Sequence, residues 1–158
     1  MRGHVVTPVR REWRRGEYVI STDPARLDVD LIHDFLAHRS YWAREIPREL
    51  VQRSIEHSLC FGLHTAGGQA GFARVVTDYA VFAYLADVFV LEPHRGLGLG
   101  KWLVETVIRC PELQGLRRWE LATNDAHDLY RRFGFGEANP ALVMERVDPA
   151  PDIYRRRS

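Results

Sequence analysis

The chain has 158 residues, a formal net charge of +1 and 46% hydrophobic residues. That length and apolar fraction predict one globular domain with its own core and exclude an intrinsically disordered chain. The small net charge excludes an overall field that would favour nucleic acid or a membrane surface, and no apolar run is long enough to cross a bilayer. We therefore expect a cytoplasmic protein whose partners include neither nucleic acid nor a membrane.

The two cysteines point to the same compartment. Cys60 and Cys110 stand far apart in apolar surroundings, and we expect both to be buried free thiols, as is usual under reducing conditions. The seven histidines show no ligand spacing such as H-E-x-x-H, so no metal site is expected.

Arginine gathers at both ends of the chain, in residues 1–16 and in the tail 148–158. Basic ends of this kind are usually solvated, and we expect two flexible segments around a single domain at residues 17–147. The alternative is that these arginines bind nucleic acid.

The first predicted elements are a short strand and two amphipathic helices. Residues 18–20, Tyr-Val-Ile, favour a strand. Residues 28–38 carry one apolar stripe at helical spacing, and an aspartate at the start suits the positive end of a helix. Pro47 opens a second helix that runs to residue 58. Between the helices, Tyr41 and Trp42 interrupt the pattern, either as core anchors or as part of the wall of a binding pocket.

Three strands are expected next. Residues 60–64 and 69–78 flank the turn Gly67-Gly68 and are expected to pair as an antiparallel hairpin. Residues 82–90 are almost all apolar or aromatic, a composition typical of a strand at the centre of a sheet that is covered on both faces. Asp87 is the only acid inside this run, and a buried charge is costly unless it is paired or functional.

The strand at 82–90 leads into a glycine-rich turn, Arg95-Gly96-Leu97-Gly98-Leu99-Gly100, and then into a helix expected over residues 98–109. Unpaired N–H groups in the first turn of a helix, together with the helix dipole, attract anions, and glycines let a phosphate approach the backbone. Arg95 and Lys101 add positive charge. The turn is therefore predicted to cradle a pyrophosphate; the alternative is a plain tight turn between strand and helix.

Two common phosphate motifs do not fit this turn. The dinucleotide fingerprint G-x-G-x-x-G fails in both registers, because Lys101 and Leu103 stand where the third glycine would be. The P-loop pattern G-x-x-x-x-G-K-[ST] matches Gly100-Lys101, but Trp102 replaces the hydroxyl residue and Arg95 replaces the first glycine. Neither a dinucleotide nor a nucleoside triphosphate is indicated.

The remaining expected elements alternate between strand and helix. A strand is expected over residues 118–122, a helix over 125–133 and a last strand over 142–146. Strands that first meander and then alternate with helices predict an α/β fold, a mixed α+β sheet with helices on both faces.

The turn fits the pattern R-x-x-G-x-G in full, and Ala126, Tyr130, Gly134 and Phe135 follow at the spacing of a second motif. With these residues the chain resembles the GNAT superfamily of acetyl-CoA-dependent N-acetyltransferases, in particular its small bacterial members. The resemblance implies a GNAT-like fold with a central, mostly antiparallel sheet, one splayed pair of strands, and helices on both faces. Dimers are common in that family, so a homodimer stays open for this chain.

For the cofactor, the resemblance implies acetyl-CoA as co-substrate and no metal. In the family the glycine-rich arm holds the CoA pyrophosphate, and the backbone of the splayed strand binds the pantetheine arm and the thioester carbonyl. The residues that match these roles are Val88, Phe89, Val90, Arg95, Gly96, Leu97, Gly98, Leu99, Gly100, Lys101 and Asn124. Asn124 stands one place after the usual asparagine position, which is Thr123 here.

The reaction that the resemblance implies is direct attack of a primary amine, from a small molecule or an exposed protein amine, on the thioester. Tyr130 corresponds to the tyrosine that protonates the leaving thiolate; a core aromatic is the other interpretation. Asp87 is expected to act as base or substrate anchor, with Glu92, a water relay or a structural ion pair as alternatives. The acceptor pocket is expected to be lined by Tyr41, Trp42 and Arg74. The alternative function is a non-catalytic acyl-CoA-binding regulatory module.

Overall fold

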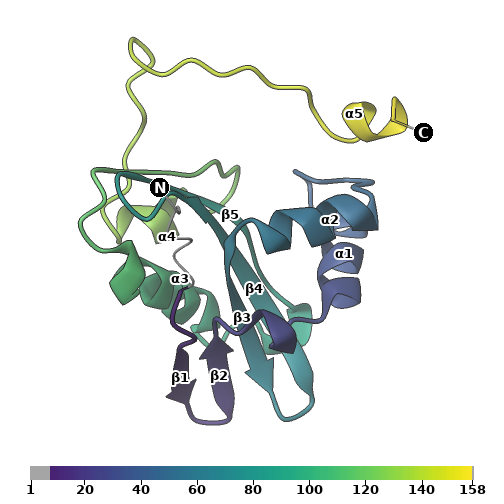
Figure 1. The fold of residues 1–158 in the computed structure, drawn as a ribbon, viewed down its shortest axis with the longest axis vertical. Helices are drawn as coiled ribbons and strands as arrows, with labels where there is room; N and C mark the ends of the chain where they lie inside the picture. Colours follow the sequence, from purple (N-terminus) through teal and green to yellow (C-terminus); the bar gives the residue numbers. More distant parts are fainter. Residues whose placement is uncertain (1–7, 158) are drawn as a thin grey trace, which may run out of the picture.

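The structure is a computed structural model that describes residues 8–157. Its centre is one six-stranded sheet in the order β1-β2-β3-β4-β5-β6 (Figure 1). Neighbouring strands are antiparallel except β5 and β6, which run parallel. The strands are β1 Glu12–Arg15, β2 Tyr18–Ser21, β3 Leu59–Thr65, β4 Gly68–Thr77, β5 Phe82–Val90 and β6 Arg118–Glu120. The mixed, mostly antiparallel sheet that the sequence predicts is confirmed.

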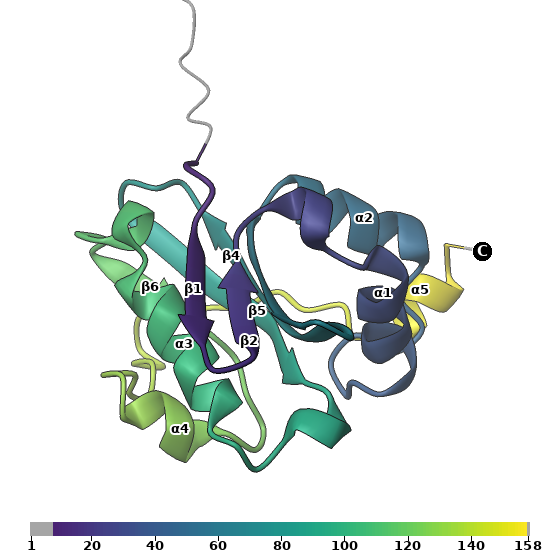
Figure 2. The same ribbon diagram turned by 90° about the horizontal axis from the view of Figure 1, so that it is seen from below.

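Helices cover both faces of the sheet, as Figure 2 shows with α1 and α2 on one side and α3 and α4 on the other. The α-helices are α1 Val29–His38, α2 Arg48–Glu56, α3 Leu99–Arg109, α4 His127–Arg131 and α5 Asp152–Arg155. Short 3-10 turns, η1 Pro24–Arg26, η2 Glu92–His94 and η3 Pro111–Leu113, connect the elements. The four predicted helices are confirmed, although α4 is shorter than residues 125–133.

Local chemistry sets the starts of the first two helices. The Asp28 side chain accepts a hydrogen bond from the Leu31 N–H and caps α1. Pro47 stands in extended conformation at the N-cap of α2, where its missing N–H leaves no donor unpaired. Both helices are amphipathic and turn their apolar stripes to the sheet.

The sheet separates two hydrophobic clusters. The larger one joins the buried side chains of α3, such as Leu103 and Val107, to Phe61 and Leu85 of the sheet. The smaller one joins α1 and α2 to the opposite face, where Phe35 stacks on Phe89 with ring centroids 3.9 Å apart. Strand β5 is therefore covered on both sides, as its continuous apolar run predicts.

Three segments differ from the sequence-based expectation, one of them the tail 148–158, which the sequence predicts to be flexible and which contains α5. Glu12–Arg15, placed by sequence in a flexible N-terminal segment, pairs with β2 from Glu12↔Ser21 to Arg15↔Tyr18; residues 1–7 of that segment lie outside the described residues. The predicted strand at 142–146 was wrong. The N–H groups of Leu142 and Val143 both bond to the Asn139 carbonyl, which bends this segment into a turn and leaves Met144 97% exposed.

The cysteine prediction is confirmed, because Cys60 and Cys110 are both buried and free. Burial raises the pKa of each thiol to about 12, so neither is a reactive thiolate at neutral pH. None of the helices within residues 8–157 is long and apolar enough to span a bilayer.

Leu103 in α3 and Leu97 in the turn before it test whether α3 packs on the sheet as part of the core. Leu103 is 0% exposed under the sheet, whereas Leu97 is 62% exposed in the turn before the helix. Leu103→Ala is expected to lower the free energy of unfolding by about 2–5 kcal/mol, because it leaves a cavity. Leu97→Ala should change it by less than about 0.5 kcal/mol. Urea denaturation measures both, and equal effects would contradict the packing of α3 on the sheet.

Candidate active site

Strands β5 and β6 pair over a short stretch only. The register runs Phe82↔Arg118, Ala83↔Trp119 and Tyr84↔Glu120, and stops there. On its other side β5 stays paired with β4 as far as Val90. Within the described residues, the β6-facing edge of β5 beyond Tyr84 therefore has no strand partner, and the two parallel strands diverge. The splayed pair that the sequence predicts is present.

The backbone of β5 kinks at Asp87. This residue has φ 55°, in the left-handed region, and the register of β4 with β5 shifts between Phe72 and Arg74 at the same level. Such a bulge re-aims side chains and bends a strand away from a neighbour. Aspartate is one of the few residues with a side chain that tolerates this conformation.

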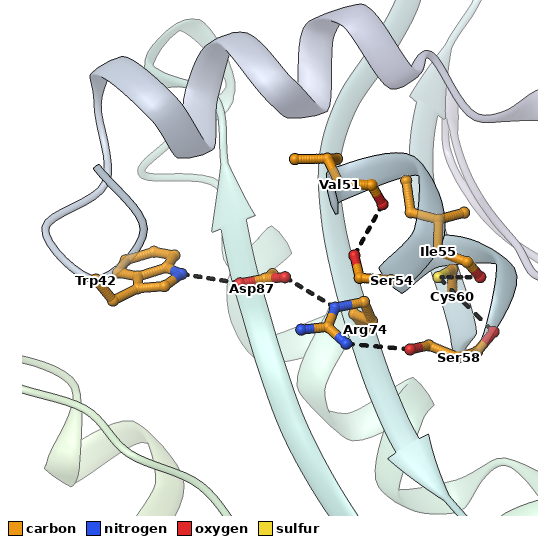
Figure 3. Close-up of polar contacts among 8 residues, drawn as sticks. All are labelled: Trp42, Val51, Ser54, Ile55, Ser58, Cys60, Arg74 and Asp87. Atoms are coloured by element: carbon orange, nitrogen blue, oxygen red, sulfur yellow. Dashed lines mark hydrogen bonds and ion pairs between the residues drawn. The ribbon is translucent and has the colours of Figure 1, made fainter. Parts of the chain in front are cut away.

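The Asp87 carboxylate is held at both oxygens (Figure 3). Its Oδ2 accepts a hydrogen bond from Arg74 Nε on β4 at 2.8 Å, and its Oδ1 accepts one from Trp42 Nε1 at 2.9 Å. Arg74 is fixed further by a bond of 3.1 Å from Nη1 to Ser58 Oγ. The Asp87 and Arg74 side chains are only 10% and 17% exposed, so the charge of each is balanced by the other.

These contacts lie at one end of a cavity of about 380 Å³, here called the Asp87 pocket. The cavity extends from the α1–α2 connection, across β5, to the start of α4. Among the residues that line it are Tyr41, Trp42, Arg74, Tyr84, Asp87, Val88, Asp125, Tyr130 and Tyr154. The two catalytic candidates and the three acceptor-pocket candidates from the sequence are thus brought together.

Tyr41 closes the pocket at the side opposite β5. Its hydroxyl accepts a hydrogen bond of 2.8 Å from the Asn124 backbone N–H, and its ring packs edge-on against Trp42 with centroids 4.9 Å apart. The Asn124 residue itself is exposed. The contact ties the α1–α2 connection to the segment before α4.

Tyr130 on α4 is 8% exposed and belongs to the larger core cluster. Burial, with smaller effects from Tyr41 and Asp125, raises the pKa of its hydroxyl to about 12. The hydroxyl is therefore protonated at neutral pH, as a proton donor must be. The ring also borders a second cavity of about 540 Å³ beside β6, which none of the other predicted site residues lines.

The glycine-rich turn has the geometry of an anion cradle. Gly96 and Gly98 have φ 80° and 75°, and Gly98 is the N-cap of α3 without a side-chain cap. The first intrahelical bond runs from Trp102 N–H to the Gly98 carbonyl, so the N–H groups of Leu99, Gly100 and Lys101 are the unpaired donors of the helix start. Positive φ at Gly98 excludes most side chains from this position.

The turn is anchored to both neighbouring strands. Arg95 Nε donates to the Val90 carbonyl at 2.9 Å, and Tyr18 Oη bonds to His94 Nδ1 at 2.9 Å. Phe89 is buried, whereas Val88 and Val90 are half-buried against α3. The predicted cofactor-binding residues from Val88 to Lys101 therefore lie along β5 and the turn into α3, with Lys101 exposed at the end, whereas Asn124 lies outside this segment, in the connection before α4.

Sequence reasoning missed Tyr84, Asp125 and Tyr154 as pocket residues. Tyr84 carries a weak signal, because it lies two positions after Phe82 in a strand and ends the β6 pairing. Asp125 stands beside the motif residues 123–135. Tyr154 lies in a predicted tail and has no local signal. Within residues 8–157 there is no group of three or more His, Cys, Asp or Glu that could hold a metal ion.

Comparisons with known proteins agree with this geometry. The family model described as "Acetyltransferase (GNAT) domain" matches residues 56–137. The Gibberella zeae protein named "Putative acetyltransferase FG08082" is 34% identical over 142 residues, which cover 76% of this chain and 79% of that protein. The crystal structure of a GNAT-family protein from Xanthomonas campestris pv. campestris (xcc2953) is 52% identical, with a TM-score of 0.83 over 86% of this chain and 96% of that one.

A third similarity is to the ribosomal-protein-S18-alanine N-acetyltransferase of Escherichia coli. The identity is 28% and the TM-score 0.60, over 77% of this chain and 79% of that chain.

The positive φ of Asp87 is tested by comparing glycine with alanine at this position. Both variants lose the carboxylate, but only alanine keeps a Cβ that opposes the left-handed conformation. Asp87→Ala is therefore expected to be less stable than Asp87→Gly by about 1 kcal/mol. At the neighbouring Ala86, which has an ordinary strand conformation, Ala86→Gly should show the reverse order. Thermal unfolding compares the variants, and the same order at both sites would argue against the bulge.

Proposed function

Because the chain belongs to the GNAT acetyltransferase family, we propose that it transfers the acetyl group of acetyl-CoA to a primary amine held in the Asp87 pocket. Members of this family are acetyltransferases that use acetyl-CoA, so the enzyme class and the co-substrate follow from membership. The amine acceptor, its pocket and the roles of individual residues are the proposal.

The observation that carries the proposal is the continuity of β5. At its end the strand meets the unpaired N–H groups of α3, and at its middle it borders a pocket that contains a protonated, buried tyrosine. An extended ligand with an anionic end and a reactive end fits this path. Its diphosphate would lie on the N–H groups of Leu99 to Lys101, with Arg95 and Lys101 adding charge.

Tyr130 is assigned the role of general acid. Attack by the amine nitrogen forms the C–N bond and breaks the C–S bond, and the leaving thiolate needs a proton. Tyr130 is one of the residues that line the pocket, and its hydroxyl remains protonated because burial raises its pKa to about 12. The acceptor must lose its ammonium proton before it attacks, and the nitrogen loses a second proton as the C–N bond forms; one proton restores Tyr130 and the other reaches solvent.

Asp87 is assigned to positioning rather than to proton removal. Both of its oxygens already accept hydrogen bonds, from Arg74 and Trp42, so the carboxylate is engaged in holding the wall of the pocket. Glu92 does not line the pocket. A water relay is therefore the route we propose for the amine proton, with Asp87 and Arg74 fixing the wall against which the acceptor lies.

Two measurements test the activity as a whole. Calorimetric titration with coenzyme A should show binding, and a screen of amines, polyamines, amino acids and peptides should show release of free CoA from acetyl-CoA. Binding without CoA release for every amine would favour a non-catalytic acyl-CoA-binding module. Absence of binding to well-folded protein would remove the proposal.

Gly98→Glu tests the cradle. The substitution adds a side chain and a negative charge where a diphosphate is proposed to lie, and we expect the affinity for coenzyme A to fall by at least about 100-fold. Gly115→Glu is the matched control, because Gly115 has nearly the same φ, 78° against 75°, outside the proposed site. Calorimetry compares the two variants. Equal loss in both would mean that backbone strain, not the site, is responsible.

Tyr130→Phe tests the general acid. Removing the hydroxyl is expected to lower kcat by about 100-fold or more with little change in coenzyme A affinity. Because the pKa of Tyr130 is about 12, its deprotonation should not limit the wild-type rate between about pH 6 and pH 10. Tyr79→Phe, at another partly buried tyrosine, is the control. A wild-type rate for Tyr130→Phe would leave this tyrosine as a core residue only.

A further inference from the structure

The C-terminal segment returns to the Asp87 pocket. Figures 1 and 2 show that a long extended segment carries α5 to the side of the molecule where α1 and α2 lie, away from α3 and α4. Tyr154 of this helix lines the pocket together with Trp42, Arg74 and Asp87. The tail is thus part of the site, although nothing in its sequence indicates that.

Tyr154 is half-buried at this position. Burial raises the pKa of its hydroxyl, and the nearby negative charge of Asp87 contributes in the same direction. Tyr154 therefore lines the same cavity as the Asp87–Arg74 ion pair.

An ion pair between distant parts of the chain holds the segment in place. Arg155 Nε donates to Glu45 Oε2 at 2.7 Å across 110 positions of sequence. Glu45 stands at φ 63° in the same connection that carries Tyr41 and Trp42, and its N–H bonds to the Ala37 carbonyl. Within the segment, Arg156 pairs with Asp148. The α1–α2 connection therefore supplies Tyr41 and Trp42 on one side of the pocket, and through Glu45 it also holds the segment that carries Tyr154.

Five aromatic side chains line the resulting pocket, together with smaller aliphatic residues such as Ile46 and Val88. The aromatic residues are Tyr41, Trp42, Tyr84, Tyr130 and Tyr154. Its charged residues are Arg74 and Asp87, which neutralise each other, and Asp125. Aromatic faces bind apolar groups and attract the ammonium form in which an amine arrives. Nothing in this lining provides an unopposed positive charge for a carboxylate-bearing acceptor.

We propose that Tyr154 is a specificity-determining wall of the acceptor site, and that the acceptor is a compact primary amine with an apolar or aromatic body. The inference rests on the proposed amine acetylation. The volume of about 380 Å³ lies near the lower end for small-molecule sites, and a wall over it leaves little room for a folded protein substrate.

The wall is held weakly enough to move. The Arg155 and Glu45 side chains are 64% and 49% exposed, and exposed ion pairs stabilise little and are screened by salt. A helix as short as Asp152–Arg155 has almost no stability of its own.

Fluorescence tests the placement without any need for activity. The fluorophore bimane, attached to the Cys of Tyr154→Cys, is quenched by a nearby indole. Cys60 and Cys110 should not be labelled, because both are buried. Replacing Trp42 with Phe in this labelled protein should raise the emission severalfold, whereas Trp13→Phe, on β1 far from α5, should leave it unchanged. Equal emission with and without Trp42 would overturn the docking of the segment.

Kinetics test the role in specificity. With phenethylamine as acceptor, Tyr154→Ala is expected to raise the acceptor KM by about tenfold, and with ethylamine by less than about twofold. The KM for acetyl-CoA and the kcat should stay within about twofold. Arg157→Ala, in the same segment and exposed, is the control. An unchanged preference between the two amines would overturn the role of Tyr154.

The two proposals can fail separately. If peptides release CoA from acetyl-CoA but neither small amine does, the acceptor class inferred here is wrong while the acetyltransferase proposal stands. If coenzyme A does not bind, the proposed function fails, and the bimane experiment still decides where Tyr154 lies.

Discussion

The site depends on how one carboxylate is held inside a strand. Asp87 occupies a left-handed backbone position that few residues tolerate, and its two oxygens are fixed by Arg74 from β4 and Trp42 from the α1–α2 connection. The kink it allows lies just beyond Tyr84, the last residue of β5 that pairs with β6. The partly buried Asp87–Arg74 ion pair therefore lies in the wall of the pocket, close to the point where β5 and β6 stop pairing.

The two halves of the site use different parts of the chain. The cradle is made of main-chain N–H groups at the start of α3, where Gly96 and Gly98 provide backbone conformations that other residues rarely adopt. The pocket is lined by side chains, five of them aromatic, from elements far apart in sequence. This division explains why the cradle has a local sequence pattern and the pocket does not. It also separates the affinity for the cofactor from the choice of acceptor.

Most of the fold could be predicted because its signals are local. The apolar run at 82–90 and the stripe at 28–38 each determine one element, and Asp87 was recognisable as the only acid in its strand. The wrong predictions concern segments whose conformation is determined by contacts with other parts of the chain rather than by their own composition. Glu12–Arg15 has no strand-like composition and pairs because β2 offers an edge. Residues 142–146 have a strand-like composition, but they form no strand because the chain turns at Asn139. Tyr154 could not be found, because its position depends on a contact to Glu45 across 110 residues.

The main-chain cradle has a consequence for turnover. N–H groups that bind a diphosphate do not distinguish a thioester from a free thiol at the far end of the same molecule. Substrate and product would therefore be bound there with nearly equal strength, and this kind of uniform binding lowers KM without raising kcat. Free coenzyme A would therefore compete with acetyl-CoA for the cradle after each turnover, and it is expected to act as a product inhibitor. In the proposed arrangement, discrimination between the thioester and the free thiol would fall to the groups around the sulfur, among them the proposed general acid Tyr130.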